Sequence, residues 1–200
     1  MKFLAAVLMV SGLFLNNGLA QTAADAAIAR ADMVAASQSI DSARDDAKDA
    51  GSAANTDYQL CQDRLQYWQG RGVPLAWFTV DNLVNFWASY YDDGQVIQSH
   101  EGVVESLMQQ ANNVSALADS GDEAYAEGNY ALACSYFAAA EQQYSDIADA
   151  FSSLENELVA AGNRMGPSRI ADIDALGLEF ESQNNGGGYF YEEREANRSA

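Results

Sequence analysis

The feature that most constrains this chain is a heptad pattern of apolar residues in its second half. Successive positions alternate steps of three and four residues, which places them on one side of a single helix. We call this set the aromatic stripe, and its members are Tyr130, Ala133, Phe137, Ala140, Tyr144, Ile147, Phe151, Leu154, Leu158 and Ala161. No proline or glycine interrupts the stripe, which predicts one helix of about 48 Å at 1.5 Å per residue.

Two more heptad stripes come earlier in the chain. The first, the alanine stripe, consists of Ala26, Ala29, Met33, Ala36, Ile40, Ala43, Ala47, Ala50 and Ala54. It predicts a helix over residues 22–50, followed after Gly51 by a second helix over 57–69, unless the glycine is tolerated and the two form one rod. The other stripe runs through Ile97, His100, Val104, Leu107, Ala111, Val114, Ala118, Gly121 and Tyr125.

Glycine and proline mark the expected ends of these helices. Gly70 and Pro74 end the front segment, Gly94 breaks a short aromatic-rich helix, and residues 162–167 end the last long one. We therefore predict an all-α fold, an antiparallel bundle of long coiled-coil-like helices with a short aromatic-rich helix and a flexible C-terminal tail. The large side chains of the aromatic stripe are expected to pack against the small ones of the alanine stripe.

The domain organisation follows from the same boundaries. Residues 1–20 have the features of a secretory signal peptide, with Lys2 before an apolar run and a small-residue cleavage site at Ala20. Residues 21–162 are expected to form the helical bundle domain, and residues 163–200 a largely flexible tail that contains a short amphipathic turn. The expected location is outside the cytoplasm, in the periplasm or the extracellular space.

The charge of the chain excludes some classes of partner. Without the leader, nine basic residues stand against 29 acidic ones, a net charge of about −20. Such a field repels phosphate backbones and anionic lipid surfaces, which argues against nucleic-acid binding and membrane-surface binding. No segment after the leader is apolar enough for membrane insertion. The simplest reading of the charge is that it keeps an acidic protein soluble.

The two cysteines, Cys61 and Cys134, are compatible with an oxidising compartment. They either form one disulfide between an early and a late helix or remain two buried apolar residues that never meet. The sequence has no pair of cysteines at metal-binding spacing and no cluster of cysteine with histidine, so we expect no metal and no cofactor.

Aromatic residues concentrate between Tyr67 and Tyr91, a window that contains all three tryptophans. Such clusters form protein-binding hot spots or line ligand pockets, although they also serve to fill the end of a bundle. The candidate binding residues are Trp77, Phe78, Trp87 and Tyr91. An aromatic triplet after Gly188 is a second candidate docking segment.

Residues 115–148 resemble a tetratricopeptide-repeat helical hairpin. The matching residues are Gly121, Gly128, Tyr130, Ala133, Phe137 and Ala140, at the spacing that this repeat uses for its small and large packing positions. Leu117, Ser120 and Ser145 depart from the tryptophan, leucine and proline of the repeat. The resemblance implies binding of a protein or peptide rather than catalysis.

These observations favour an exported, non-enzymatic scaffold or adaptor that binds another protein or peptide, with self-association also open. The alternative is a carrier of a small apolar ligand in an aromatic-lined cavity of the bundle, to which His100 could contribute. A carrier would enclose its aromatic rings around a void, whereas an adaptor would display them. We expect no enzymatic activity, because scattered carboxylates and a single histidine form no recognisable acid–base or nucleophile pair.

Overall fold

A computed structural model describes residues 21–79 and 84–185, and these residues form helices without any strand. The elements are α2 (Ala23–Gly70), the 3-10 helix η1 (Leu75–Thr79), α3 (Val84–Ala126), α4 (Tyr130–Met165) and α5 (Pro167–Asn185). The predicted all-α fold is confirmed. By its packing the chain divides into two compact units, each described separately below. Of the described residues, unit 1 contains 21–48 and 102–154, and unit 2 contains 49–79, 84–101 and 155–185.

The aromatic stripe forms the buried face of α4. All of its members from Ala133 to Ala161 are buried, and Phe137, Phe151 and Leu158 are 0 % exposed. Burying a side chain of that size stabilises the fold by about 1.5–3 kcal/mol, so the stripe holds this helix in place. The helix begins after a turn in which Gly128 has φ 75°, a backbone conformation that glycine adopts without strain.

Helix α2 is one continuous helix of 48 residues, which is the alternative in which Gly51 is tolerated. At its N-terminus Thr22 and Asp25 cap each other. The Thr22 amide donates to Asp25 Oδ2 at 2.8 Å, and the Asp25 amide donates to Thr22 Oγ1 at 3.3 Å. These hydrogen bonds lower the pKa of Asp25.

Two of the glycines that the sequence marked as breaks, Gly51 and Gly94, lie inside helices, and neighbouring elements approach both closely. A Cβ built on Gly51 would lie 2.3 Å from His100 Cδ2, and one on Gly94 would lie 2.9 Å from Tyr58 Cε2. The predicted break at Gly94 is therefore wrong. The loss of helix propensity at a glycine, about 1 kcal/mol, is smaller than the cost of forcing these contacts apart.

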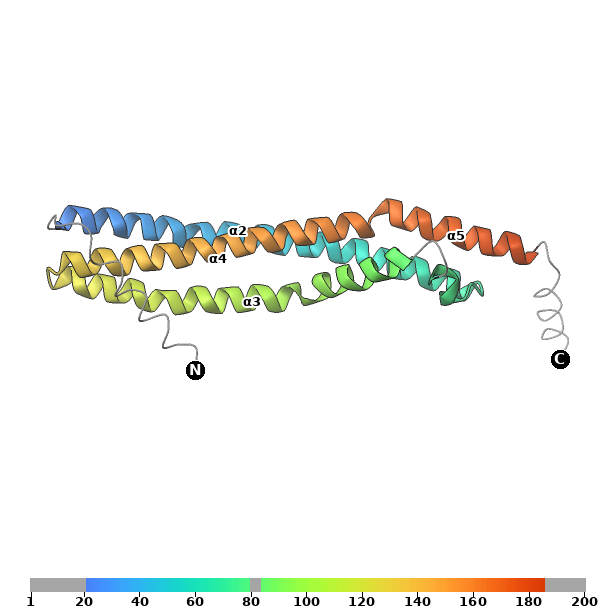
Figure 1. The fold of residues 1–200 in the computed structure, drawn as a ribbon, viewed down its shortest axis with the longest axis horizontal. Coiled ribbons are helices and arrows are strands. Elements are labelled where there is room, and N and C mark those ends of the chain that lie inside the picture. Colours follow the sequence, from blue (N-terminus) through green and yellow to red (C-terminus); the bar gives the residue numbers. More distant parts are fainter. Residues whose placement is uncertain (1–20, 80–83, 186–200) are drawn as a thin grey trace. The chain divides into compact units, whose positions relative to one another are not determined.

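Within unit 1, the parts of α2, α3 and α4 lie side by side (Figure 1). Ser37 of α2 lies close enough to Tyr144 of α4 to affect the pKa of its phenol, so the helices that carry the alanine stripe and the aromatic stripe are neighbours here. Arg30 of α2 donates two hydrogen bonds to Asp122 of α3, at 2.7 and 3.2 Å.

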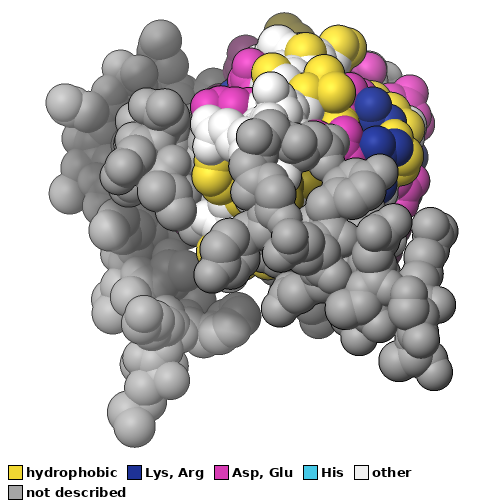
Figure 2. All heavy atoms as spheres, turned by 90° about the vertical axis from the view of Figure 1, so that its right-hand side faces the viewer, with side chains coloured by type: hydrophobic (Ala, Val, Ile, Leu, Met, Phe, Trp, Pro, Cys, Tyr) yellow, Lys and Arg dark blue, Asp and Glu magenta, His cyan; other side chains and the backbone are white. Residues whose placement is uncertain are grey.

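Within unit 2, helix α5 packs on α2 through paired charges. Arg64 and the Trp68 indole both donate to Asp174, the indole at 2.8 Å, and Arg71 Nε donates to Glu181 at 2.6 Å. Figure 2 shows basic side chains bordered by acidic ones on the face that it views. Residues 167–185 form the helix α5, whereas the sequence predicted a largely flexible tail with a short amphipathic turn. Residues 186–200 of that tail lie outside the described part of the structure.

Candidate functional site

The four aromatic residues predicted to bind a partner occupy different environments. Phe78 is fully buried in unit 2, and Trp77 is half-buried. The Trp77 indole donates to the Leu176 carbonyl at 2.9 Å and packs edge-on against Phe180, so it holds η1 against α5. Trp87 lies in α3, but its side chain is outside the described part of the structure. Of the described three, only Tyr91 is displayed, at 64 % exposure.

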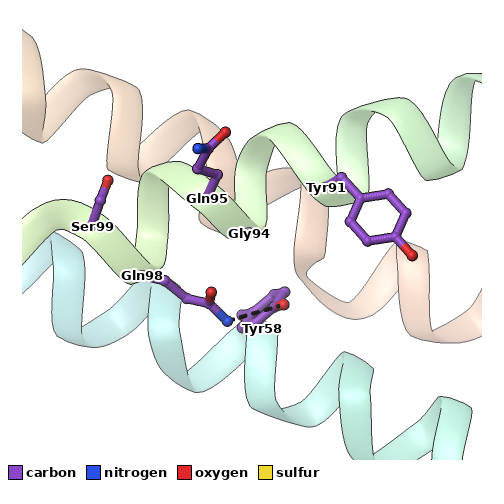
Figure 3. Close-up of a pocket in the computed structure, with 6 residues that line it drawn as sticks. All are labelled: Tyr58, Tyr91, Gly94, Gln95, Gln98 and Ser99. Carbon is purple, nitrogen blue, oxygen red and sulfur yellow. Dashed lines mark hydrogen bonds between the residues drawn. The ribbon is translucent and has the colours of Figure 1, made fainter.

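Tyr91 lies on the rim of an open hollow of about 510 Å³ in unit 2, which we call the tyrosine groove. Its lining residues are Tyr58, Tyr91, Gly94, Gln95, Gln98 and Ser99. In Figure 3, Tyr58 projects from α2 toward Gln98 of α3, and Tyr91 lies further along α3. Each α3 lining residue has another one three or four positions away, so together they form one stripe that runs about 12 Å along the helix.

A tyrosine network fixes the floor of the groove. Gln98 Nε2 donates to Tyr58 Oη at 3.3 Å, and the Tyr58 and Tyr90 rings lie 5.4 Å apart. Tyr90 is also hydrogen-bonded to Tyr58 and to Gln62. Burial, followed by the hydrogen bond to Tyr58, raises the pKa of Tyr90 above its ordinary value, so the phenol stays neutral. These contacts join α2 to α3 at the groove.

The charges beside the groove are acidic. Asp92 and Glu101 are exposed on α3, and each lies next to or within one turn of a lining residue. Asp93, only 4 % exposed, is held by two hydrogen bonds from Arg164 at 2.5 and 2.8 Å. Helix α3 has no lysine or arginine of its own. The carboxylates that face solvent beside the groove are therefore not balanced by a cation from the same helix.

His100 is a packing residue of α3. Its ring lies against Gly51 of α2, and its Nδ1 is 2.5 Å from the Ile97 carbonyl oxygen. The lining residues of the groove are tyrosines, glutamines, a glycine and a serine, which offer hydrogen bonds and ring faces but no nucleophile–base pair. Within residues 21–79 and 84–185, no group of histidine, cysteine and carboxylate side chains could hold a metal ion.

Cys61 and Cys134 are both buried free thiols, so no disulfide joins them. Cys61 is enclosed in unit 2, where its Sγ donates to the Met165 carbonyl at 2.9 Å, and burial raises its pKa to about 11. Cys134 belongs to unit 1, where burial likewise raises its pKa. Each cysteine serves as a small residue of its own core, the second of the two alternatives left open by the sequence.

Sequence reasoning missed Tyr58, Gln95 and Gln98, because their role depends on how α2 and α3 align. The one feature of the sequence that could have indicated the groove is Gly94, a small residue next to the aromatic window, which was interpreted as a helix break.

None of the helices described in the structure combines the length and apolar character needed to cross a membrane. Comparisons with protein-family models, curated proteins and solved structures found no match for this chain.

Proposed function

We propose that this protein is an exported, non-enzymatic helical scaffold that binds a segment of another protein in the tyrosine groove. The observation that carries the proposal is the exposure of Tyr91, 64 %, beside an open hollow in which Gln98 of α3 donates a hydrogen bond to Tyr58 of α2. Exposed tyrosines are enriched among residues that dominate binding energy, because they bury a large rigid ring and keep a polar end.

The form of the groove supports a peptide rather than a small apolar ligand. A carrier encloses most of the surface of its ligand, whereas this hollow is open and lined by glutamine and serine as well as tyrosine. Glutamine amides match the hydrogen-bonding groups of a peptide backbone. The resemblance of residues 115–148 to a tetratricopeptide hairpin, and the signal-like residues 1–20, are the sequence features on which binding and export rest.

The experiment is a selection of peptides from a random display library on residues 21–200, followed by calorimetry with each recovered peptide. Tyr91→Ala is expected to weaken binding about tenfold, the loss typical of a central aromatic contact. Ile28→Ala is the matched control, because Ile28 is similarly exposed, at 62 %, but lies in unit 1.

Equal affinities for wild type and Tyr91→Ala would contradict the groove as the binding site. Failure to recover any peptide, together with saturable binding of the neutral dye Nile red, would instead support the carrier alternative.

A further inference from the structure

The basic residues of this chain are confined to its two ends. All ten lysines and arginines lie at or before Arg71 or at or after Arg164, so residues 72–163 contain none of them. The same stretch contains 14 of the 29 aspartates and glutamates. It includes the whole of α3, which provides most of the tyrosine groove. Any ligand that enters the groove therefore meets a helix with negative charges only.

Two exposed carboxylates flank the groove at defined positions. Asp92 follows Tyr91 and precedes Gln95 by three residues, and Glu101 follows Gln98 by three residues. Residues three apart on a helix are neighbours on its surface, so both carboxylates stand within one turn of the lining side chains. Asp93, the third acidic residue of this segment, is buried and paired with Arg164, so it is not available to a ligand.

The ring of Tyr91 adds a second contact suited to a cation. Aromatic faces attract guanidinium and ammonium groups, and arginine makes such contacts most often. At 64 % exposure the Tyr91 ring is accessible to a ligand, and its edge contact with Tyr90, with ring centroids 5.9 Å apart, helps to orient it. The ring, the hollow and the two carboxylates occupy the same stretch of α3.

We infer that the partner segment is cationic, with arginine or lysine side chains that lie over Tyr91 and beside Asp92 and Glu101. This inference rests on the proposed function and names the chemistry of its partner. A second copy of this chain is a poor candidate, because its net charge is −19. An acidic or phosphate-bearing ligand would be repelled by the same field.

The test uses a rhodamine-labelled peptide of eight residues in which arginine and alanine alternate, with binding to residues 21–200 measured by fluorescence anisotropy. The charge-reversed peptide, with glutamate in place of arginine, is expected not to bind. Raising NaCl from 20 to 300 mM is expected to lower the affinity for the arginine peptide, because salt screens the attraction between exposed charges. These two results alone would not distinguish the groove from the general field of the protein.

Two matched pairs of variants locate the site. Asp92→Asn and Asp149→Asn each remove one negative charge, so both lower the general attraction of the protein for a cation equally. Asp149 is exposed on α4 in unit 1, away from the groove. Asp92→Asn is therefore expected to weaken binding more than Asp149→Asn does. Tyr91→Leu is expected to weaken binding about two- to fivefold, the effect of losing an exposed cation–π contact, whereas Tyr91→Phe should retain it.

Equal effects of Asp92→Asn and Asp149→Asn, together with no effect of Tyr91→Leu, would overturn the inference. If peptides recovered from the library bind through Tyr91 but carry no excess of arginine or lysine, the partner class is wrong and the proposed function stands. If no peptide of any charge depends on Tyr91, both fail.

Discussion

At the residue scale, two glycines of α3 have opposite roles. Both Gly102 and Gly121 lie in unit 1, but a Cβ on Gly121 would stand 2.5 Å from Phe137 Cε1, and one on Gly102 would meet nothing within 4 Å. Phe137 is 0 % exposed and cannot move aside without disturbing the core. The small size of Gly121 is thus a packing requirement, whereas Gly102 only weakens the helix.

This difference predicts opposite changes in stability for the same substitution. Gly121→Ala should destabilise the protein by about 1–3 kcal/mol through overpacking. Gly102→Ala should stabilise it by about 0.5–1 kcal/mol, because alanine is the better helix former. Urea unfolding monitored by circular dichroism measures both free energies, and a gain in stability for Gly121→Ala would refute the packing argument.

At the element scale, α5 depends on a few polar contacts with α2. The ion pairs Arg64–Asp174 and Arg71–Glu181 repeat at an interval of seven residues on both helices, which sets their register. Asp174 accepts from Arg64 and also from Trp68, and the hydrogen bond from Arg64 is the main cause of its lowered pKa. Loss of this one carboxylate leaves two donors of α2 without their acceptor.

We expect Asp174→Ala to loosen α5 locally, by about 1 kcal/mol, since the contacts are partly exposed to solvent. Amides of residues 167–185 should then exchange with deuterium about fivefold faster. The control is Asp172→Ala, an exposed position on the same helix, which should leave exchange unchanged. Equal exchange in both variants would mean that packing alone holds α5.

The same contact gives a pH dependence with a defined sign. Because the folded-state pKa of Asp174 lies below its ordinary value of 3.8, its contribution is fully present above that pH. The contribution is lost as the pH falls through the lowered value. Wild-type α5 should therefore approach the exchange rate of Asp174→Ala in acid.

Heptad spacing predicted the helices and their buried faces because it depends only on local periodicity. It did not predict α5, because the pairing of Arg64 with Asp174 joins residues 110 positions apart. It also left open whether a helix ends at Gly51, because the close approach of His100 to this glycine is a long-range contact that the sequence does not reveal. The groove stayed hidden for the related reason that Tyr58 and Gln98 meet only once two helices are aligned.

At the scale of the whole molecule, charge is distributed unevenly along the chain. The α3–α4 hairpin of unit 1, residues 102–154, carries no lysine or arginine. Among the described residues it forms one ion pair, in which Asp122 of the hairpin binds Arg30 of α2. Asp119, Glu123 and Glu127 are exposed and follow one another at intervals of four residues. Like charges at this spacing repel, so the hairpin should gain stability when salt is added.

Two charge reversals with the same effect on net charge separate local repulsion from the field of the whole protein. Glu123→Lys replaces two repulsive neighbours with attractive ones near the end of α3, whereas Asp32→Lys lies on α2 with no charged residue three or four positions away. Glu123→Lys should therefore be the more stable of the two in 20 mM NaCl, by about 0.5–1 kcal/mol. The difference should shrink toward zero in 1 M NaCl, where the screening length falls to about 3 Å. Thermal unfolding at both salt concentrations measures it. Equal gains in low salt would show that the net charge of the chain, rather than the arrangement of carboxylates on the hairpin, limits its stability.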